Sequence, residues 1–242
     1  MRAKYALIFG YNEYSKQMGL ELDDGFTKVE SYVLNETYEH LKDEDRVGLL
    51  EFDLSDDWDE IAKKYNEDEI IIYCALDNDA QNIFLTISLR EVFKNAYMIA
   101  LGQNSESSQK LLLAGASKVI PILQTTANII TEILEKPIIT SMIHDILFED
   151  SDLKIAQITL KKYSAVDGVK LHKVAWQEHY GVIVMAVVDK EMSNSFLFTS
   201  KGYNHLLDAG DILVVVGYNE DIHNLETEIG ESNESYWRNW RR

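Results

Sequence analysis

Short apolar runs alternate with longer stretches suited to helices, and this pattern constrains the fold of the chain more than any other feature. In the first half, the strand-like runs occupy residues 5–9, 29–34, 47–52, 69–75, 96–101 and 118–122. The helix-like stretches between them cover residues 13–22, 55–65, 79–93 and 105–114. Strands separated by helices favour a parallel sheet with right-handed crossovers, and apolar runs such as residues 70–73 suit strands covered on both faces. The pattern therefore predicts an α/β fold with a Rossmann-like lobe over residues 1–136.

The pattern changes in the second half. A helical run that begins near Thr125 ends before Pro137, and an amphipathic stretch over 138–147 leads to an acidic break at 148–152. Beyond this break, the sequence predicts strands from Leu153 and over 182–188, 196–199 and 212–216, with helices over 170–177 and 219–229. Asn219 is expected to cap the last helix. We therefore predict connecting helices and a hinge over 137–152, a smaller α/β lobe over 153–229 and a tail over 230–242.

The composition narrows the classes of partner. Lys and Arg total 23 against 41 Asp and Glu, so the formal charge of -18 repels nucleic acids and anionic lipid surfaces. The single cysteine, Cys74, excludes an internal disulfide and a metal cage built only of cysteines, which fits a reducing compartment. Apolar runs also stay shorter than the roughly 20 residues that span a bilayer. We expect a cytoplasmic protein that reaches the inner face of the cell membrane through a partner or through a preceding membrane segment.

Several short motifs occur in a characteristic order across the two predicted lobes. The first lobe contains Ile8-Phe9-Gly10-Tyr11, Asp53, the run from Ala75 to Asn82, and Leu113-Ala114-Gly115-Ala116. The second contains Gly168-Val169-Lys170-Leu171 and Asp208-Ala209-Gly210-Asp211-Ile212-Leu213. In this order the chain resembles the RCK family (TrkA-N plus TrkA-C), the regulatory domains of potassium channels and Trk or Ktr transporters. The resemblance covers roughly residues 5–229. It implies a homodimer built through the connecting helices, a higher ring assembly, and a membrane-embedded potassium pore as partner.

The resemblance also implies a site for an adenine nucleotide or NAD(H), but the phosphate loop departs from the usual pattern. A dinucleotide fingerprint reads Gly-x-Gly-x-x-Gly, so that the backbone approaches the pyrophosphate at a helix N-terminus. This chain reads Gly10-Tyr11-Asn12-Glu13-Tyr14-Ser15, which keeps only the first glycine. Asn35 stands where the ribose acid is expected, and Leu101 stands where the family often has an arginine. The expected ligand-binding residues are Gly10, Tyr11, Asn12, Glu13, Asn35, Asp53, Leu76, Asp77, Asn82 and Leu101.

For Gly10 and Asp53 a purely structural interpretation stays open. Gly10 is suited to the turn from strand to helix, and Asp53 is suited to capping the helix that follows it. The acidic segment 53–60 offers oxygen ligands for a hard cation, although its spacing does not match an EF-hand loop and an acidic first helical turn explains it more simply. A second acidic run, 149–152, fits either a cation site between lobes or a loop.

We predict no catalytic residues and no metal ligands. The six histidines lack the i, i+4 spacing of a zinc helix, and Cys74 fits a packed core thiol better than a nucleophile. The leading hypothesis is a cytosolic gating module that couples binding of a small molecule to a potassium pore. The alternative is an NAD(P)-dependent oxidoreductase built on the same Rossmann lobe. The tail, with two tryptophans beside three arginines, suits a membrane interface, a protein anchor, or an acidic face of its own chain or a neighbouring subunit.

Overall fold

A computed structural model describes residues 4–22, 26–148, 152–190, 196–199, 202 and 204–230. The chain divides into two compact units, residues 1–131 and 132–242, which are described separately. Most of the predicted hinge run 149–152 and nearly all of the predicted tail lie outside the described residues. Within the described part, no helix is both long enough and apolar enough to cross a membrane.

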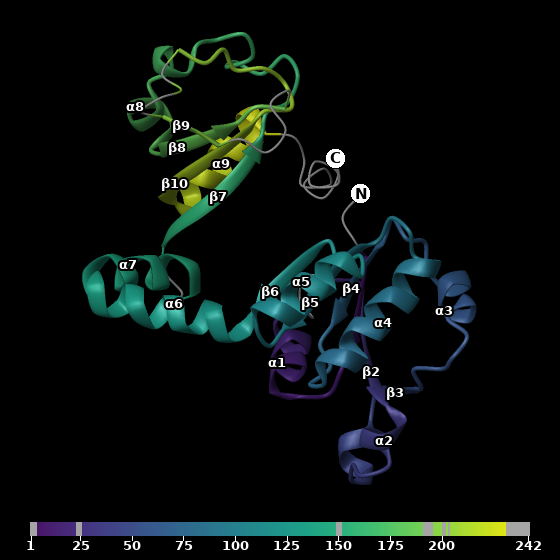
Figure 1. Ribbon diagram of the computed structural model, residues 1–242. Helices are drawn as coiled ribbons and strands as arrows, with labels where there is room; N and C mark the ends of the chain where they lie inside the picture. Colours follow the sequence, from purple (N-terminus) through teal and green to yellow (C-terminus); the bar gives the residue numbers. More distant parts are fainter. Residues whose placement is uncertain are drawn as a thin grey trace. The chain divides into compact units, whose positions relative to one another are not determined.

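The first unit is built on a six-stranded parallel sheet with strand order β3-β2-β1-β4-β5-β6 (Figure 1). Its strands are β1 (Tyr5–Phe9), β2 (Lys28–Leu34), β3 (Leu49–Phe52), β4 (Ile70–Cys74), β5 (Tyr97–Gly102) and β6 (Lys118–Pro121). The strand order reverses between β1 and β4, which pair directly and in register from Tyr5 with Ile70 to Phe9 with Cys74. In an open α/β sheet, the carboxyl ends of strands at such a reversal form the usual ligand site. The predicted Rossmann-like fold is confirmed.

Helices connect these strands on both sides of the sheet. They are α1 (Glu13–Leu22), α2 (Asn35–Tyr38), the 3-10 helix Asp43–Arg46, α3 (Asp59–Lys64), α4 (Asp79–Val92) and α5 (Ser105–Leu113). Helix α1 packs on β1 and β2, whereas α4 and α5 pack on each other and on β4, β5 and β6. Right-handed crossovers place α1 on the opposite face from α3, α4 and α5. Helix α6 (Ile122–Glu135) begins directly after β6, three residues earlier than the sequence pattern suggested.

The main core of this unit lies between the sheet and α3, α4 and α5. Phe9 is central, because it stacks on Tyr32 at 4.6 Å between ring centroids and meets Phe52 and Trp58 edge-on. Fully buried aliphatic side chains such as Leu89 complete the cluster. Burial of this aromatic and aliphatic surface is the main favourable term that holds the helices on the sheet.

The predicted helix over 55–65 is wrong in its first half. Residues 53–58 form turns, and α3 begins only at Asp59. The aspartates themselves explain the difference. The Asp53 N–H donates to the Asp56 carboxylate, the Ser55 N–H donates to Asp53, and the Asp59 N–H donates to Asp57. Short acidic side chains that bind nearby backbone N–H groups favour turns over helix.

The second unit begins with the end of α6 and with α7 (Pro137–Phe148), followed by a small antiparallel sheet. The sheet has strand order β7-β10-β8-β9, with β7 (Leu153–Thr159), β8 (Ile183–Val188), β9 (Phe196–Phe198) and β10 (Ile212–Tyr218). The helix α9 (Asn219–Ile229) packs on β7 and β10, and the short α8 (Trp176–Tyr180) packs on α9 and β8. Ile158, Val215 and Leu225 lie in the core between this sheet and the helices. The predicted smaller α/β lobe is confirmed.

Two local predictions for this lobe are wrong. The single helix expected over 170–177 is a 3-10 turn, Leu171–Lys173, followed by α8, because Val174 and Ala175 leave the helical conformation. Asn219 does not cap α9. It is the first helical residue, and its backbone N–H donates to the Asp152 carbonyl at 2.9 Å, while Tyr218 occupies the N-cap position without a capping side chain.

Candidate functional site

Gly10 closes β1 at the point where the strand order reverses. Its φ is +136°, and a Cβ atom built on it would lie 2.4 Å from the Ala75 carbonyl oxygen. The Gly10 N–H donates to the Tyr32 carbonyl, and the Ala75 N–H donates to the Phe9 carbonyl. Gly10 is therefore required by the close approach of the β1 and β4 ends, whether or not a ligand binds there.

Asn12 occupies the start of α1, where a dinucleotide pyrophosphate would lie in a Rossmann site. Its side-chain oxygen accepts the Ser15 N–H at 3.0 Å, and its own N–H donates to Ser15 Oγ at 2.8 Å. Its amide nitrogen donates to the Ala75 carbonyl at 2.7 Å and to the Asp77 carboxylate at 2.8 Å. The first two bonds form a reciprocal capping box, which uses backbone donors that would otherwise face an anion.

Asparagine caps also occur at two other helices that start at this edge of the sheet. Asn78 caps α4 by accepting the N–H groups of Ala80 and Gln81. Asn104 forms a full capping box with Ser107 at the start of α5. Asn12 thus accepts one N-terminal donor of α1, and Asn78 and Asn104 accept two each at α4 and α5. Helix N-termini attract phosphate through free N–H groups, so each cap reduces the number of donors left for a pyrophosphate at this edge.

Besides Gly10, three of the predicted ligand residues are buried. Asn82 is fully buried, and its amide nitrogen donates to the carbonyls of Cys74 (3.2 Å) and Leu101 (2.9 Å) while its oxygen accepts the Leu76 N–H. Leu76 and Leu101 are only 6% and 8% exposed. Asn82 therefore ties the ends of β4 and β5 together, and this structural role accounts for its hydrogen bonds completely.

Asn35 and Asp53 lie near the ends of β2 and β3. Asn35 is the first residue of α2, and its amide, oriented as a donor, reaches the Glu51 carboxylate (3.2 Å) and the Phe52 carbonyl (2.7 Å). Asp53 accepts the hydroxyl of Ser55 at 2.5 Å and its N–H at 2.8 Å, and these bonds hold the pKa of Asp53 below its ordinary value. Because α3 starts only at Asp59, the proposed helix-capping role of Asp53 is wrong.

The remaining predicted residues, Tyr11, Glu13 and Asp77, lie around the start of α1. Glu13 and Asp77 are exposed, and Glu13 forms an ion pair with Lys16 at 3.1 Å. The Lys16 ammonium also lies 4.5 Å from the centroid of the Tyr11 ring. A hollow of about 340 Å³ extends from Gly10 and Tyr11 along α1 to β2 and β3. The predicted phosphate loop therefore lies beside a concave surface, which is bordered by the Lys16 ammonium and the Tyr11 ring.

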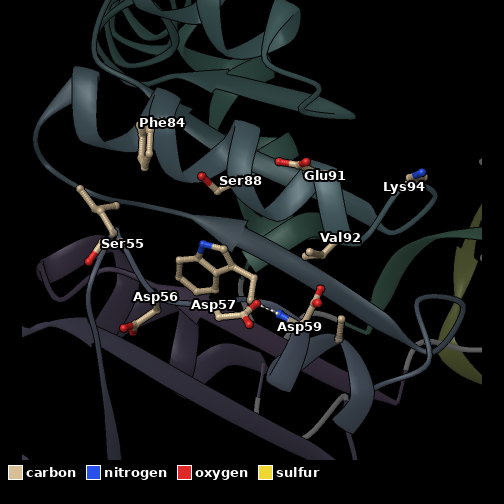
Figure 2. A pocket seen from close by; sticks show the side chains of 12 residues that line it. Ser55, Asp56, Asp57, Asp59, Phe84, Ser88, Glu91, Val92 and Lys94 are labelled. Carbon is tan, nitrogen blue, oxygen red and sulfur yellow. Dashed lines mark hydrogen bonds between the residues drawn. The ribbon is translucent and has the colours of Figure 1, made fainter.

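A larger hollow of about 700 Å³ lies between the turns of residues 54–59 and helix α4 (Figure 2). Asp56, Asp57 and Asp59 line one wall, and Ser88 and Glu91 of α4 line the other. Most of the acidic segment 53–60, which offers oxygen ligands for a hard cation, lines this hollow. Within the described residues, however, no group of three or more His, Cys, Asp or Glu side chains has a geometry that could hold a metal ion.

Cys74 is the free thiol at the end of β4, and it is completely buried. Burial raises the pKa of its thiol to about 12, so the reactive thiolate is scarce at neutral pH. This agrees with the expected packed core thiol.

The asparagine caps are the site feature that sequence reasoning missed. A signal was present, because Asn12 and Ser15, like Asn104 and Ser107, have the three-residue spacing of a capping box. The bonds from Asn12 to Ala75 and Asp77, in contrast, join residues 63 and 65 positions apart in the chain. No local pattern predicts such a contact.

Comparison with known proteins adds to this geometry. Residues 6–122 match the family model of the TrkA-N domain, and residues 155–230 match that of the TrkA-C domain. The chain belongs to the RCK family. The two domains of this RCK protein stand in the order that the sequence motifs predicted, and together they cover most of its length.

Two curated relatives of this RCK protein come from Methanocaldococcus jannaschii. Potassium channel protein 1 is 24% identical over 172 residues, which are 71% of this chain and 50% of the relative. Probable potassium channel protein 2 is 24% identical over 237 residues, 92% of this chain and 66% of the relative. The chain thus spans only half to two thirds of the length of these relatives. The human SLO3 gating ring has the same fold, with a TM-score of 0.62 at 11% identity over 91% of this chain and 46% of that one.

Proposed function

We propose that this RCK protein is the cytoplasmic regulatory module of a potassium channel or potassium transporter, and that it couples binding of a small molecule to opening of the pore. The observation that carries the proposal is the ordered TrkA-N and TrkA-C pair in a chain whose relatives are potassium channel proteins. The Rossmann-like unit supplies a ligand-binding edge at β1 and β4, and the connecting helices supply a surface on which subunits can move. No bond-making step is required of any residue.

Potassium flux tests this function directly. Vesicles that contain the pore, with this chain either fused to it or added as a separate subunit, should show potassium flux that depends on the chain. The flux should change when a ligand that raises the melting temperature of the chain is added. A flux that is the same with and without the chain would contradict the proposal.

The connecting helices α6 and α7 support assembly into a homodimer. They expose Ile129, Ile130 and Ile133 on α6, and Met142 and Ile143 on α7, each between 42% and 54%. Ile146, one turn further along α7, is buried at 7% exposure. Exposed apolar side chains of this kind on a helix are typical of a subunit interface, and a twofold interface would bury those of each helix against a second copy.

Ile143→Asp should weaken the homodimer at least tenfold, because it places a charge in the apolar seam. Sedimentation equilibrium of the wild type and the variant measures the effect. Ser141→Asp is the matched control, since it adds the same charge to an exposed position on the other side of α7. A wild type that remains monomeric at micromolar concentration, or equal weakening by both variants, would count against the interface.

An adenine nucleotide or NAD(H) is the proposed ligand of the TrkA-N domain, but the capping box at Asn12 predicts weak affinity for NAD. Replacing Asn12 by glycine and Glu13 by glutamine should tighten NAD at least tenfold, or about 1.4 kcal/mol. The change frees the Ser15 N–H and removes a nearby carboxylate. Most of the gain should come from Asn12, because Glu13 is exposed and already paired with Lys16.

Isothermal titration calorimetry with NAD decides this prediction, and Glu21→Gln, at the far end of α1, controls for loss of one charge. Tight NAD binding by the wild type would show that the caps do not exclude the pyrophosphate. Equally weak binding by wild type and double variant would place the defect elsewhere, at Asn35 or Leu101.

A further inference from the structure

The larger hollow, between residues 54–59 and helix α4, is separate from the predicted nucleotide site. It measures about 700 Å³, and none of its lining residues is among the ligand residues that the sequence predicted. On α4 it is lined by residues from Phe84 to Val92, whereas the ligand edge lies at the start of this helix, near Asp79. A hollow of this size can hold a small organic molecule. The side chains of its walls indicate the chemistry of that molecule.

The Trp58 indole supplies an unused hydrogen-bond donor to this hollow. Trp58 lines it and is only 6% exposed, since its ring lies 5.7 Å, between centroids, from those of Phe9 and Phe52 in the core. Among the described residues no group accepts the Trp58 N–H, whereas the Trp176 N–H donates to the Leu171 carbonyl. The Trp58 nitrogen is not sealed inside the core either, so it faces open space. A buried indole N–H usually has a partner, so Trp58 offers a fixed donor to a ligand that carries an acceptor atom.

Carboxylates without ion-pair partners line both walls of the same hollow. Asp56, Asp57 and Asp59 lie on one wall, and Glu91 lies on the opposite wall (Figure 2). In the part of the chain that the structure describes, none of the four forms an ion pair, and Lys94 is the one basic residue that lines the hollow. The four carboxylates do not form a group that could hold a metal ion. Their excess of negative charge therefore suits the ammonium group of a larger organic molecule.

Apolar side chains complete the lining. Leu54, Ala62 and Val92 pack against the core from this side, and the Phe84 ring is 52% exposed. An exposed aromatic ring can contact both an apolar ring and an ammonium group. We propose that the hollow binds a small aromatic amine, whose ammonium group lies among the carboxylates and whose oxygen accepts the Trp58 N–H. This ligand would be additional to the one proposed for the β1–β4 edge, and its binding can be measured without a pore.

Tyramine is a suitable probe, because it joins an ammonium group to a phenol oxygen through an aromatic ring. Two related compounds each lack one of these groups: 4-ethylphenol lacks the ammonium, and phenethylamine lacks the oxygen. In NMR spectra of the ¹⁵N-labelled full chain, the indole N–H signal of Trp58 reports on binding, and Trp58→Phe identifies this signal by its loss. We expect tyramine to shift the signal in a saturable way. It should bind about tenfold more tightly than 4-ethylphenol and about fivefold more tightly than phenethylamine. Equal binding of the three compounds, or no shift with millimolar tyramine, would overturn the proposal.

Two variants separate the local carboxylates from the total charge of the chain. Glu91→Gln should weaken tyramine binding about threefold, because it removes one carboxylate from the hollow. Glu60→Gln removes the same charge from an exposed residue of α3 that does not line the hollow, and it should leave the affinity unchanged. Both positions are exposed, so neither variant should alter the fold. Equal weakening by both variants would show that only the long-range field attracts the amine, and the proposed site would be wrong.

Two other occupants of the hollow give different results in the same spectra. If calcium chloride shifted the Trp58 signal as tyramine does, the carboxylates would be assigned to a metal ion. If the signal changed with protein concentration but not with tyramine, the hollow would be assigned to a contact with a second copy of the chain. Either result would overturn the binding of an aromatic amine.

Discussion

Replacing Gly10 by alanine should lower the free energy of unfolding of the TrkA-N domain by about 3 kcal/mol or more. Two effects add at this position. The φ of +136° is strained for any residue with a side chain, and the new Cβ would lie 2.4 Å from the Ala75 oxygen and 2.7 Å from its carbon. Both clashing atoms belong to the backbone at the end of β4, so relief requires β1 and β4 to separate at their carboxyl ends.

Gly48→Ala is the matched control. Gly48 also has a positive φ, +80°, but a Cβ there would meet nothing within 4 Å. Gly48→Ala should lower the free energy of unfolding only by the cost of the strained backbone conformation, about 1 kcal/mol. Urea unfolding followed by Trp58 fluorescence, in a background where Trp176, Trp237 and Trp240 are replaced by phenylalanine, reports on the first unit. Equal losses for the two variants would show that the approach of Gly10 to Ala75 carries no strain of its own.

The fold could be predicted from the sequence because its two periodicities are clear. Buried parallel strands such as β4 appear in the sequence as uninterrupted apolar runs. From Leu153 on, apolar and polar residues alternate, and this alternation marks the change to a sheet that helices cover on one face only. The sequence predictions are wrong where hydrogen bonds from short polar side chains determine the backbone conformation. The turns of residues 53–58 have helix-compatible spacing, but their aspartates bind neighbouring N–H groups in ways that residue spacing alone does not reveal.

The site could be predicted only in part. The first glycine of the loop and the reversal of strand order follow from the chain pattern, and the structure places Gly10 and Asp77 at the same edge. Asn82 illustrates the limit. It lies in a stretch that resembles ligand-binding sequence, yet its side chain bonds to the ends of β4 and β5, a contact that depends on how the two strands pair.

The caps affect how a ligand that carries a phosphate would bind at this edge. A pyrophosphate would have to displace the Asn12 side chain from the Ser15 N–H and from the Ala75 carbonyl before it reached the α1 terminus. Each hydrogen bond contributes about 1 kcal/mol, so the loop lowers the affinity for a phosphate group but does not exclude it. A ligand held mainly through its uncharged part avoids this opposition. The hollow lined by Tyr11 and Lys16 offers an aromatic ring for such binding.

A second large effect is expected at Glu30, a carboxylate inside β2 that is only 5% exposed. It accepts hydrogen bonds from Lys28 (2.7 Å), Lys64 (2.8 and 3.0 Å) and the Tyr32 hydroxyl (2.8 Å). Burial alone would raise the pKa of Glu30, but the bonds from Lys28, Lys64 and Tyr32 outweigh it and lower the pKa to about 2. The folded chain thus holds this group ionised at pH values where the unfolded chain protonates it.

Glu30→Gln should therefore cost about 2 kcal/mol at pH 7, because the amide leaves Lys28 and Lys64 without a buried anion. Since the folded pKa is depressed, the stability that Glu30 contributes is complete above about pH 4.5 and is lost as the pH falls toward 2. The difference between wild type and variant, measured by urea unfolding from pH 7 to pH 3, should shrink below pH 4.5. Glu106→Gln, which breaks an exposed pair with Lys110, should change stability little. A difference that stays constant with pH would show that Glu30 acts through packing and not through its charge.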